Sequence, residues 1–169
     1  MTNLPDPETA RLVEELASPD PGARAAAAEA LCHAGEAARP AAATLVAACA
    51  DGDETVREWI VAALEELGPP AETDLGALVP LVGSPEPLVA YWAATLVGRQ
   101  GSAAAPAVDA LVARLEGAGP IDVRQRAAWA LGQIGAPAAK ARPALEAAAG
   151  GDDPRLARLA SEALAALGS

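Results

Sequence analysis

The stretch VRQRAAWALGQIG, residues 123–135, joins a helical spacing of apolar residues to a closing glycine. Ala127 and Leu131 lie four residues apart and therefore share one face of a helix. Gly135 follows them, and glycine is the residue that most readily ends a helix in a left-handed conformation. Trp129 lies outside this apolar stripe, although the chain has only three tryptophans, one tyrosine and no phenylalanine. The stretch indicates an amphipathic helix and leaves one large ring to be explained.

Five copies of this pattern occur along the chain. Apolar residues recur four, eight and twelve positions before a glycine in each copy, and a leucine follows ten positions after each of the first four glycines. Each unit is therefore predicted to be a pair of helices. The closing glycines are Gly35, Gly68, Gly101, Gly135 and Gly168, spaced 33, 33, 34 and 33 residues apart, and the units are about 6–35, 36–68, 69–101, 102–135 and 136–168.

Acidic residues mark the predicted helix starts. Asp20 and Asp153 each precede a proline, so that a side-chain acceptor at the N-cap is followed by a residue whose missing N–H is not needed at the first helical position. Asp6 and Asp53 offer the same kind of cap, and Glu86 offers a weaker one. The ten predicted helices are about 7–17, 21–34, 38–50, 54–67, 73–83, 87–100, 104–116, 121–134, 138–149 and 154–167.

The composition indicates a core of small aliphatic residues. The 169 residues are 52% hydrophobic but 2% aromatic, which favours alanine, leucine and valine packed between closely spaced helices. The formal net charge of -11 argues against nucleic acid as a partner, because phosphate binding draws on clustered lysine and arginine. No apolar run is long enough to cross a bilayer, and acids stand near the start where a secretory signal would be basic. We expect one soluble, cytoplasmic domain over residues 1–169, with no membrane association.

Residues 122–149, DVRQRAAWALGQIGAPAAKARPALEAAA, resemble the HEAT-like repeats of the phycobilisome-lyase type. The third and fifth units carry Ala90 and Ala157 where that repeat has an arginine, so we do not expect a continuous arginine ladder. The resemblance implies an all-α, right-handed α-solenoid of five helix pairs, whose second helices line a concave surface. The positions that match the repeat's arginine and proline are Arg24, Arg57, Arg124 and Pro143.

All four aromatic residues fall on the predicted exposed face of the second helices, at ten, nine or six positions before a glycine. They are Trp59, Tyr91, Trp92 and Trp129. Trp59 and Trp92 hold equivalent positions in adjacent units, so one helix spacing, ~8 to 10 Å, is expected between them. We interpret the rings as a diagonal aromatic track that binds a protein or peptide segment on the concave surface. The alternative is that rings too large for an alanine core cover neighbouring alanines.

Charged residues on the same face change sign along the chain. The first two units carry Glu58 and Glu66, whereas the later units carry Arg99 and Arg126. A bound segment would present its basic end to the first units and its acidic end to the later ones. The predicted partner-binding residues are Trp59, Tyr91, Trp92, Trp129, Glu58, Glu66, Arg99, Arg126, Gln133 and His33.

We predict a non-catalytic scaffold with no cofactor and no metal. Cys32, His33 and Cys49 lack metal-ligand spacing, and Cys49 stands at a position that is apolar in other units. An enzymatic alternative is a HEAT-like DNA glycosylase for alkylated bases, using tryptophans and a carboxylate such as Glu58 or Glu66. The net charge argues against that alternative.

Two further expectations concern partners. A role as a bilin-lyase-type accessory component follows from the resemblance alone. The last helix keeps an ordinary apolar stripe, which is compatible with a monomer or with a weak homodimer formed through a terminal repeat.

Overall fold

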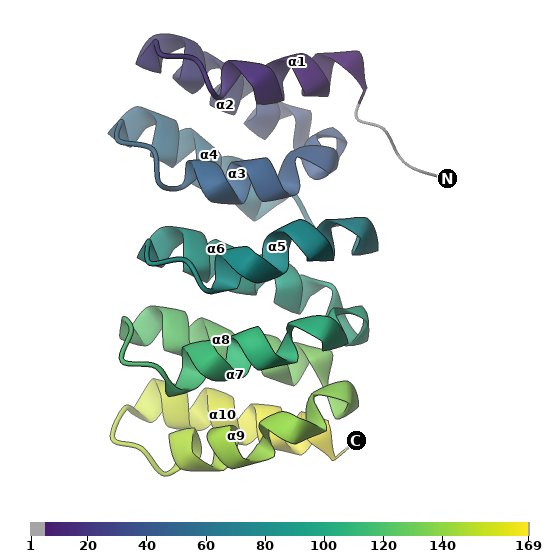
Figure 1. Cartoon of the computed structure of the whole chain (residues 1–169), viewed down its shortest axis with the longest axis vertical. Coiled ribbons are helices and arrows are strands. Elements are labelled where there is room, and N and C mark those ends of the chain that lie inside the picture. The colour runs from purple at the N-terminus through teal and green to yellow at the C-terminus, as the bar shows by residue number, and fades with distance from the viewer. Residues whose placement is uncertain (1–5, 169) are drawn as a thin grey trace. The chain divides into compact units, whose positions relative to one another are not determined.

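The computed structural model describes residues 6–168, and every regular element in that range is a helix (Figure 1). Residues 1–5 and 169 of the predicted domain lie outside the described range. The described chain divides into two compact units, unit 1 ending at Asp74 and unit 2 beginning at Leu75. The contacts below lie within one unit or the other. The predicted all-α fold of repeated helix pairs is confirmed.

Unit 1 contains two helix pairs. Its second helices pack against each other and bury Ala27 and Ile60, which hold the same position in successive repeats. Asp20 and Asp53 cap these two helices as predicted, by accepting hydrogen bonds from backbone N–H groups of the first turn. The helices are α1 (Pro7–Glu15), α2 (Pro21–Ala34), α3 (Ala42–Ala48) and α4 (Glu54–Glu66).

Unit 2 contains three helix pairs in two layers. In Figure 1 the first helices of the pairs lie in front of the second helices. Ala93, Ala127 and Ala160, eight positions before the repeat glycines, are fully buried between the layers. Asp153 caps the last helix, whereas Glu86 makes no side-chain cap bond. The helices are α5 (Leu75–Val82), α6 (Pro87–Arg99), α7 (Val108–Glu116), α8 (Ile121–Ile134), α9 (Arg142–Ala149) and α10 (Pro154–Leu167).

The first helices of the later repeats are shorter than predicted. Their expected opening turns are 3₁₀ helices, and prolines such as Pro40 and Pro106 lie inside them and disfavour the α conformation of the residue before them. Apolar spacing alone does not separate the two kinds of turn. The 3₁₀ segments are Gly35–Ala41, Glu72–Asp74, Gly101–Ala107 and Ala136–Ala141.

Four of the five repeat glycines reverse the chain as predicted. Gly35, Gly68, Gly101 and Gly135 have φ values between 54° and 69°, in the region that residues with a Cβ rarely adopt. The same expectation is wrong for Gly168, which has a φ of -97°. Its N–H closes an ordinary turn on a carbonyl three residues earlier, so no left-handed residue is required there.

The repeat arginines bind the carbonyl ends of the first helices. Each donates to a carbonyl oxygen in or just after the first helix of its own pair. The pairs are Arg24 Nη1 with Ser18, Arg57 Nη1 with Asp51, and Arg124 Nε with Leu115, at N···O distances of 2.9, 2.6 and 2.9 Å.

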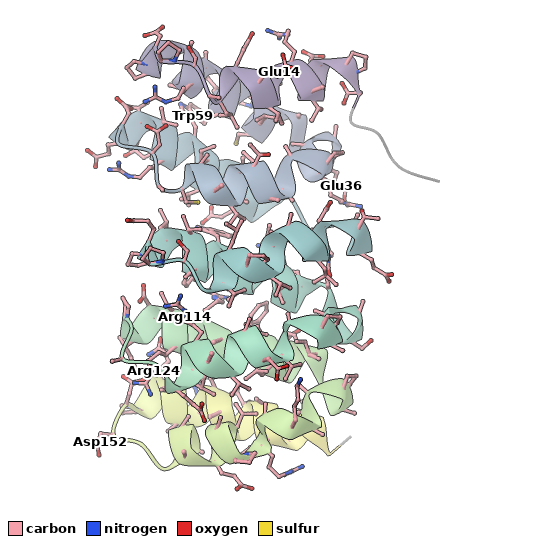
Figure 2. The ribbon with its side chains drawn as sticks, in the orientation of Figure 1. Glu14, Glu36, Trp59, Arg114, Arg124 and Asp152 are labelled. Carbon is pink, nitrogen blue, oxygen red and sulfur yellow. The ribbon has the colours of Figure 1, made fainter. Side chains whose placement is uncertain are left out.

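Another arginine replaces the missing one in the third repeat. Ala90 stands at the arginine position, and Arg114 of the following first helix donates instead to the carbonyls of Val82 and Ser84, at 3.0 and 2.8 Å. Figure 2 shows Arg114 and Arg124 on the same side of unit 2. The ladder is therefore discontinuous in sequence, as expected, but the end of α5 still has arginine donors.

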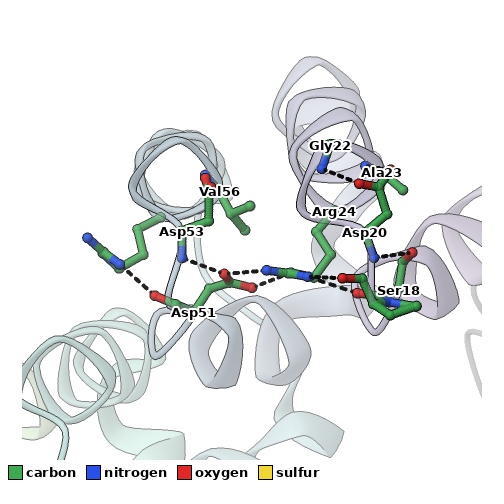
Figure 3. Close-up of polar contacts among 10 residues, drawn as sticks. Ser18, Asp20, Gly22, Ala23, Arg24, Asp51, Asp53 and Val56 are labelled. Carbon is green, nitrogen blue, oxygen red and sulfur yellow. Dashed lines mark hydrogen bonds and ion pairs between the residues drawn. The ribbon is translucent and has the colours of Figure 1, made fainter.

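Arg24 also joins the two repeats of unit 1 through an ion pair with Asp51 (Figure 3). Its Nε and Nη2 donate to the two carboxylate oxygens at 2.7 and 2.9 Å, which is a bidentate geometry. Asp51 accepts a further bond from the backbone N–H of Asp53. These contacts lower the pKa of Asp51, with the Arg24 hydrogen bond as the main cause.

The second helices of unit 2 approach most closely at two glycines. A Cβ added to Gly98 of α6 would lie 2.5 Å from Trp129 Cζ3 and 3.0 Å from the Cα of Ala130, both on α8. Gly132 of α8 is similarly close to α10, where a Cβ would lie 3.1 Å from the Cα of Ala163. Real side-chain carbons do not occupy such positions without displacement of the neighbouring helix. The absence of a side chain therefore sets the spacing between α6 and α8.

We predict that Gly98→Ala lowers the free energy of unfolding by about 1–3 kcal/mol, because the added methyl group collides with Trp129 and Ala130. Urea denaturation followed by circular dichroism measures the loss. Gly76→Ala in α5 is the control, since nothing lies within 4 Å of its added Cβ. Equal stability of the two variants would show that α6 and α8 are not in close contact at this point.

We predict that Asp51→Asn lowers the melting temperature at neutral pH. A carboxyl with a lowered pKa in the folded state stabilises the fold above its unfolded pKa of about 3.9, and this contribution disappears as the pH falls through the folded pKa. The difference from the wild-type protein should therefore shrink below about pH 4. Asp152→Asn, in an exposed loop, is the matched control. A difference independent of pH would contradict the ion-pair explanation.

Candidate binding surface

Arg126 lies between two aromatic rings on the second helices of unit 2. Its guanidinium carbon is 4.4 Å from the ring centroid of Tyr91 on α6 and 5.0 Å from that of Trp129 on α8. Its Nη2 also donates a hydrogen bond to the Tyr91 hydroxyl. Cation–π contact with both rings restrains all three side chains, each of which remains partly accessible. The structure thus brings together three of the predicted site residues.

Trp129 has two roles in this cluster. One part of its ring covers Gly98, where a side chain is absent, and another part remains half-buried at the surface. It does not belong to the buried stripe of α8, which contains Val123, Ala127 and Leu131 as predicted. The ring is therefore fixed by its neighbour helix and still accessible to a partner.

The expected accessibility of Trp92 is wrong. Its side chain is only 6% exposed, and it packs against Tyr91 in an edge-to-face arrangement with 5.7 Å between centroids. Arg99 lies over it, with the guanidinium carbon 5.8 Å from the ring centroid. Most of the circumference of α6 is buried, including Thr95 on the face predicted to be open. Trp92 is therefore a core residue, and its ring packs against the ring of Tyr91.

The predicted residues of unit 1 form a separate group. His33 on α2 and Trp59 on α4 lie with their ring centroids 5.9 Å apart, tilted by 55°. Trp59 is half-buried, whereas His33, Glu58 and Glu66 are exposed. The His33 Nε2 is 3.9 Å from a carboxylate oxygen of Glu29. Unit 1 therefore presents an acidic surface around one tryptophan.

A pocket of about 350 Å³ opens beside the Arg126 cluster. Its walls come from the second helices of the three pairs in unit 2. Gln125 is 8% exposed there and donates to the carboxylate of Asp153 at 2.9 Å, so the pocket has a fixed polar wall. We call the lining residues the arginine pocket: Leu88, Tyr91, Asp122, Gln125, Arg126, Trp129, Arg155 and Leu159.

Five pocket residues were missing from the predicted site, and they are Leu88, Asp122, Gln125, Arg155 and Leu159. Leu88, Asp122 and Arg155 each stand thirteen positions before a repeat glycine, one helical turn beyond the face that the repeat alignment defined. The repeat alignment could have identified these three residues, because they stand at the same position relative to the repeat glycine. Gln133, which was predicted, borders a smaller neighbouring hollow that also contacts Trp129.

The cysteines differ in environment. Cys49 is 3% exposed, and burial raises its pKa to about 12, as suits the core residue that the sequence predicts. Burial also raises the pKa of the partly accessible Cys32. Within residues 6–168, no group of three or more His, Cys, Asp or Glu side chains could hold a metal ion. None of the described helices is long and apolar enough to span a membrane.

The fold defines a helical repeat protein of the HEAT type. A family model of HEAT repeats matches residues 9–96 and 108–169, so the chain belongs to the HEAT repeat family. The predicted resemblance is thereby confirmed. A comparison with curated proteins finds no match.

Solved structures with a similar fold include engineered and natural repeat proteins. An engineered protein determined by the Northeast Structural Genomics Consortium has a TM-score of 0.66 at 23% identity, over 97% of this chain and 81% of that chain. A designed armadillo repeat protein in complex with the peptide (KR)4 has a TM-score of 0.67 at 19% identity, over 94% and 81%. The CpcE and CpcF complex of phycocyanin lyase from Nostoc sp. PCC7120 has a TM-score of 0.63 at 25% identity, over 98% and 66%.

We predict that Trp92→Ala lowers the free energy of unfolding by about 3–5 kcal/mol, because it removes a large buried ring from α6. Trp59→Ala is the matched control, since Trp59 holds the equivalent repeat position but is half-buried. Its effect should be clearly smaller when both are measured by urea denaturation. A small loss of stability for Trp92→Ala would show that this ring is not part of the core.

Proposed function

We propose that the chain is a non-catalytic scaffold that binds an extended segment of a partner protein on the second helices of unit 2. The observation that carries this proposal is Arg126, held between Tyr91 and Trp129 at the wall of an open pocket. Arginine, tyrosine and tryptophan are the side chains most often found at the energetic centres of protein interfaces. The proposal retains the predicted aromatic surface but moves its centre to the arginine pocket.

Pre-organisation supports a binding role. The rings of Tyr91 and Trp129 rest on Trp92 and Gly98 respectively, and Arg126 contacts both rings. Side chains that are already restrained lose little conformational entropy when a partner binds. The pocket therefore offers a rigid anchor site.

The repeat geometry supports an extended partner. Consecutive second helices place equivalent residues at regular intervals, so one segment can contact α6, α8 and α10 in turn. Structural neighbours agree with this use of the fold, because one holds a peptide and another is a complex of two proteins. The titratable side chains that line the pocket are two arginines, a tyrosine and an aspartate, a set suited to holding charged groups.

The test is selection of a library of short random peptides displayed on phage against the full chain. We expect peptides whose affinity falls about tenfold or more in Leu159→Gln, which replaces an apolar contact of the pocket. Val112→Gln is the matched control, because Val112 is equally half-buried but lies on the first helix α7. Fluorescence anisotropy measures the affinities, and circular dichroism confirms that both variants fold.

Failure to select any peptide would contradict the proposal. Selected peptides that bind Leu159→Gln as well as the wild-type protein would contradict it equally, because their site would then lie outside the pocket.

A further inference from the structure

The arginine pocket has the opposite charge to the rest of the protein. Two guanidinium groups, Arg126 and Arg155, line it together with one carboxylate, Asp122. The chain as a whole carries a formal charge of -11. A local excess of positive charge on an acidic protein selects against basic ligands. The pocket repels the basic ligands that the remaining surface attracts.

The ends of three helices add to this positive potential. Leu88, Asp122 and Arg155 are each the second residue of a long helix, α6, α8 and α10 respectively. The pocket therefore lies beside three helix N-termini, which carry partial positive charge. The carboxylate of Asp122 accepts the N–H of Val123 at 2.9 Å.

The guanidinium groups can still bind a ligand. Arg126 uses an Nη2 donor for the Tyr91 hydroxyl, whereas an arginine has five N–H donors, so further donors remain for a ligand. Arg155 is exposed at the rim of the pocket. Leu88 and Leu159 provide apolar walls between these charged groups.

We propose that the arginine pocket binds the carboxylate of an aspartate or glutamate side chain in the partner segment. Arg126 and Arg155 donate to the carboxylate, and the leucines contact the methylene groups that precede it. Phosphate, the other anion that arginine pairs with, is the alternative that the test below distinguishes from a carboxylate. This inference rests on the proposed function and names the chemistry of its partner.

The test uses three acetylated and amidated peptides, (EA)4, (QA)4 and (KA)4, titrated into the isotopically labelled full chain and followed by NMR. We expect (EA)4 to bind at least about tenfold more tightly than (QA)4, and (KA)4 not to bind at the pocket. Arg155→Gln should remove most of the preference for (EA)4. Arg158→Gln should leave it unchanged, because Arg158 lies outside the pocket on the same helix and is paired with Glu162 at 2.8 Å.

Several outcomes would overturn the inference. They are equal binding of (EA)4 and (QA)4, no binding of any of the three, and tighter binding when phosphoserine replaces glutamate. The peptides selected by display separate this result from the proposed function. If they require the pocket but carry no excess of aspartate or glutamate, the carboxylate inference fails and the binding scaffold stands.

Discussion

The close approach of α6 and α8 at Gly98 is the constraint on which the candidate site depends. Because Gly98 has no side chain, the ring of Trp129 lies directly over the backbone of α6. This position brings Arg126, one turn before Trp129, against the ring of Tyr91. Gly132 and Ala163 repeat the close approach between α8 and α10. A packing requirement of the core therefore also determines how the surface aromatics are held.

Arginine has three different uses in this protein. Arg24, Arg57 and Arg124 bind carbonyls at the ends of first helices, and Arg114 does so from the next repeat where Ala90 leaves none. Arg24 in addition pairs with Asp51 across the repeats of unit 1. Arg126 instead contacts two aromatic rings at the pocket wall. An arginine in the repeat motif is therefore structural, and the candidate functional arginines lie at other registers.

The sequence predicts the fold well because the repeat supplies five aligned copies of each helix. The bounds of α2, α8 and α10 agree with prediction, since a glycine follows each helix and an aspartate caps the start of α2 and of α10. The first helices are predicted less well, because 3₁₀ turns and α-turns share the same apolar residues. Glu86 shows a similar limit, since a residue of cap type makes no cap bond there.

The candidate site is only partly predictable. Helical periodicity identifies Tyr91, Arg126 and Trp129 as neighbours on one face, and the structure agrees. It gives no information on how far that face is covered in the folded chain, which is why Trp92 was expected to be accessible but is buried. The expected track from Trp59 to Trp92 joins residues of the two units and stays a prediction.

The direct test of the binding surface is NMR mapping of a display-selected peptide on the isotopically labelled chain. The account predicts that the largest shifts of backbone amides fall in the first two turns of α6, α8 and α10, around the arginine pocket. Shifts concentrated on the first helices α5, α7 and α9, or spread evenly over unit 2, would contradict it.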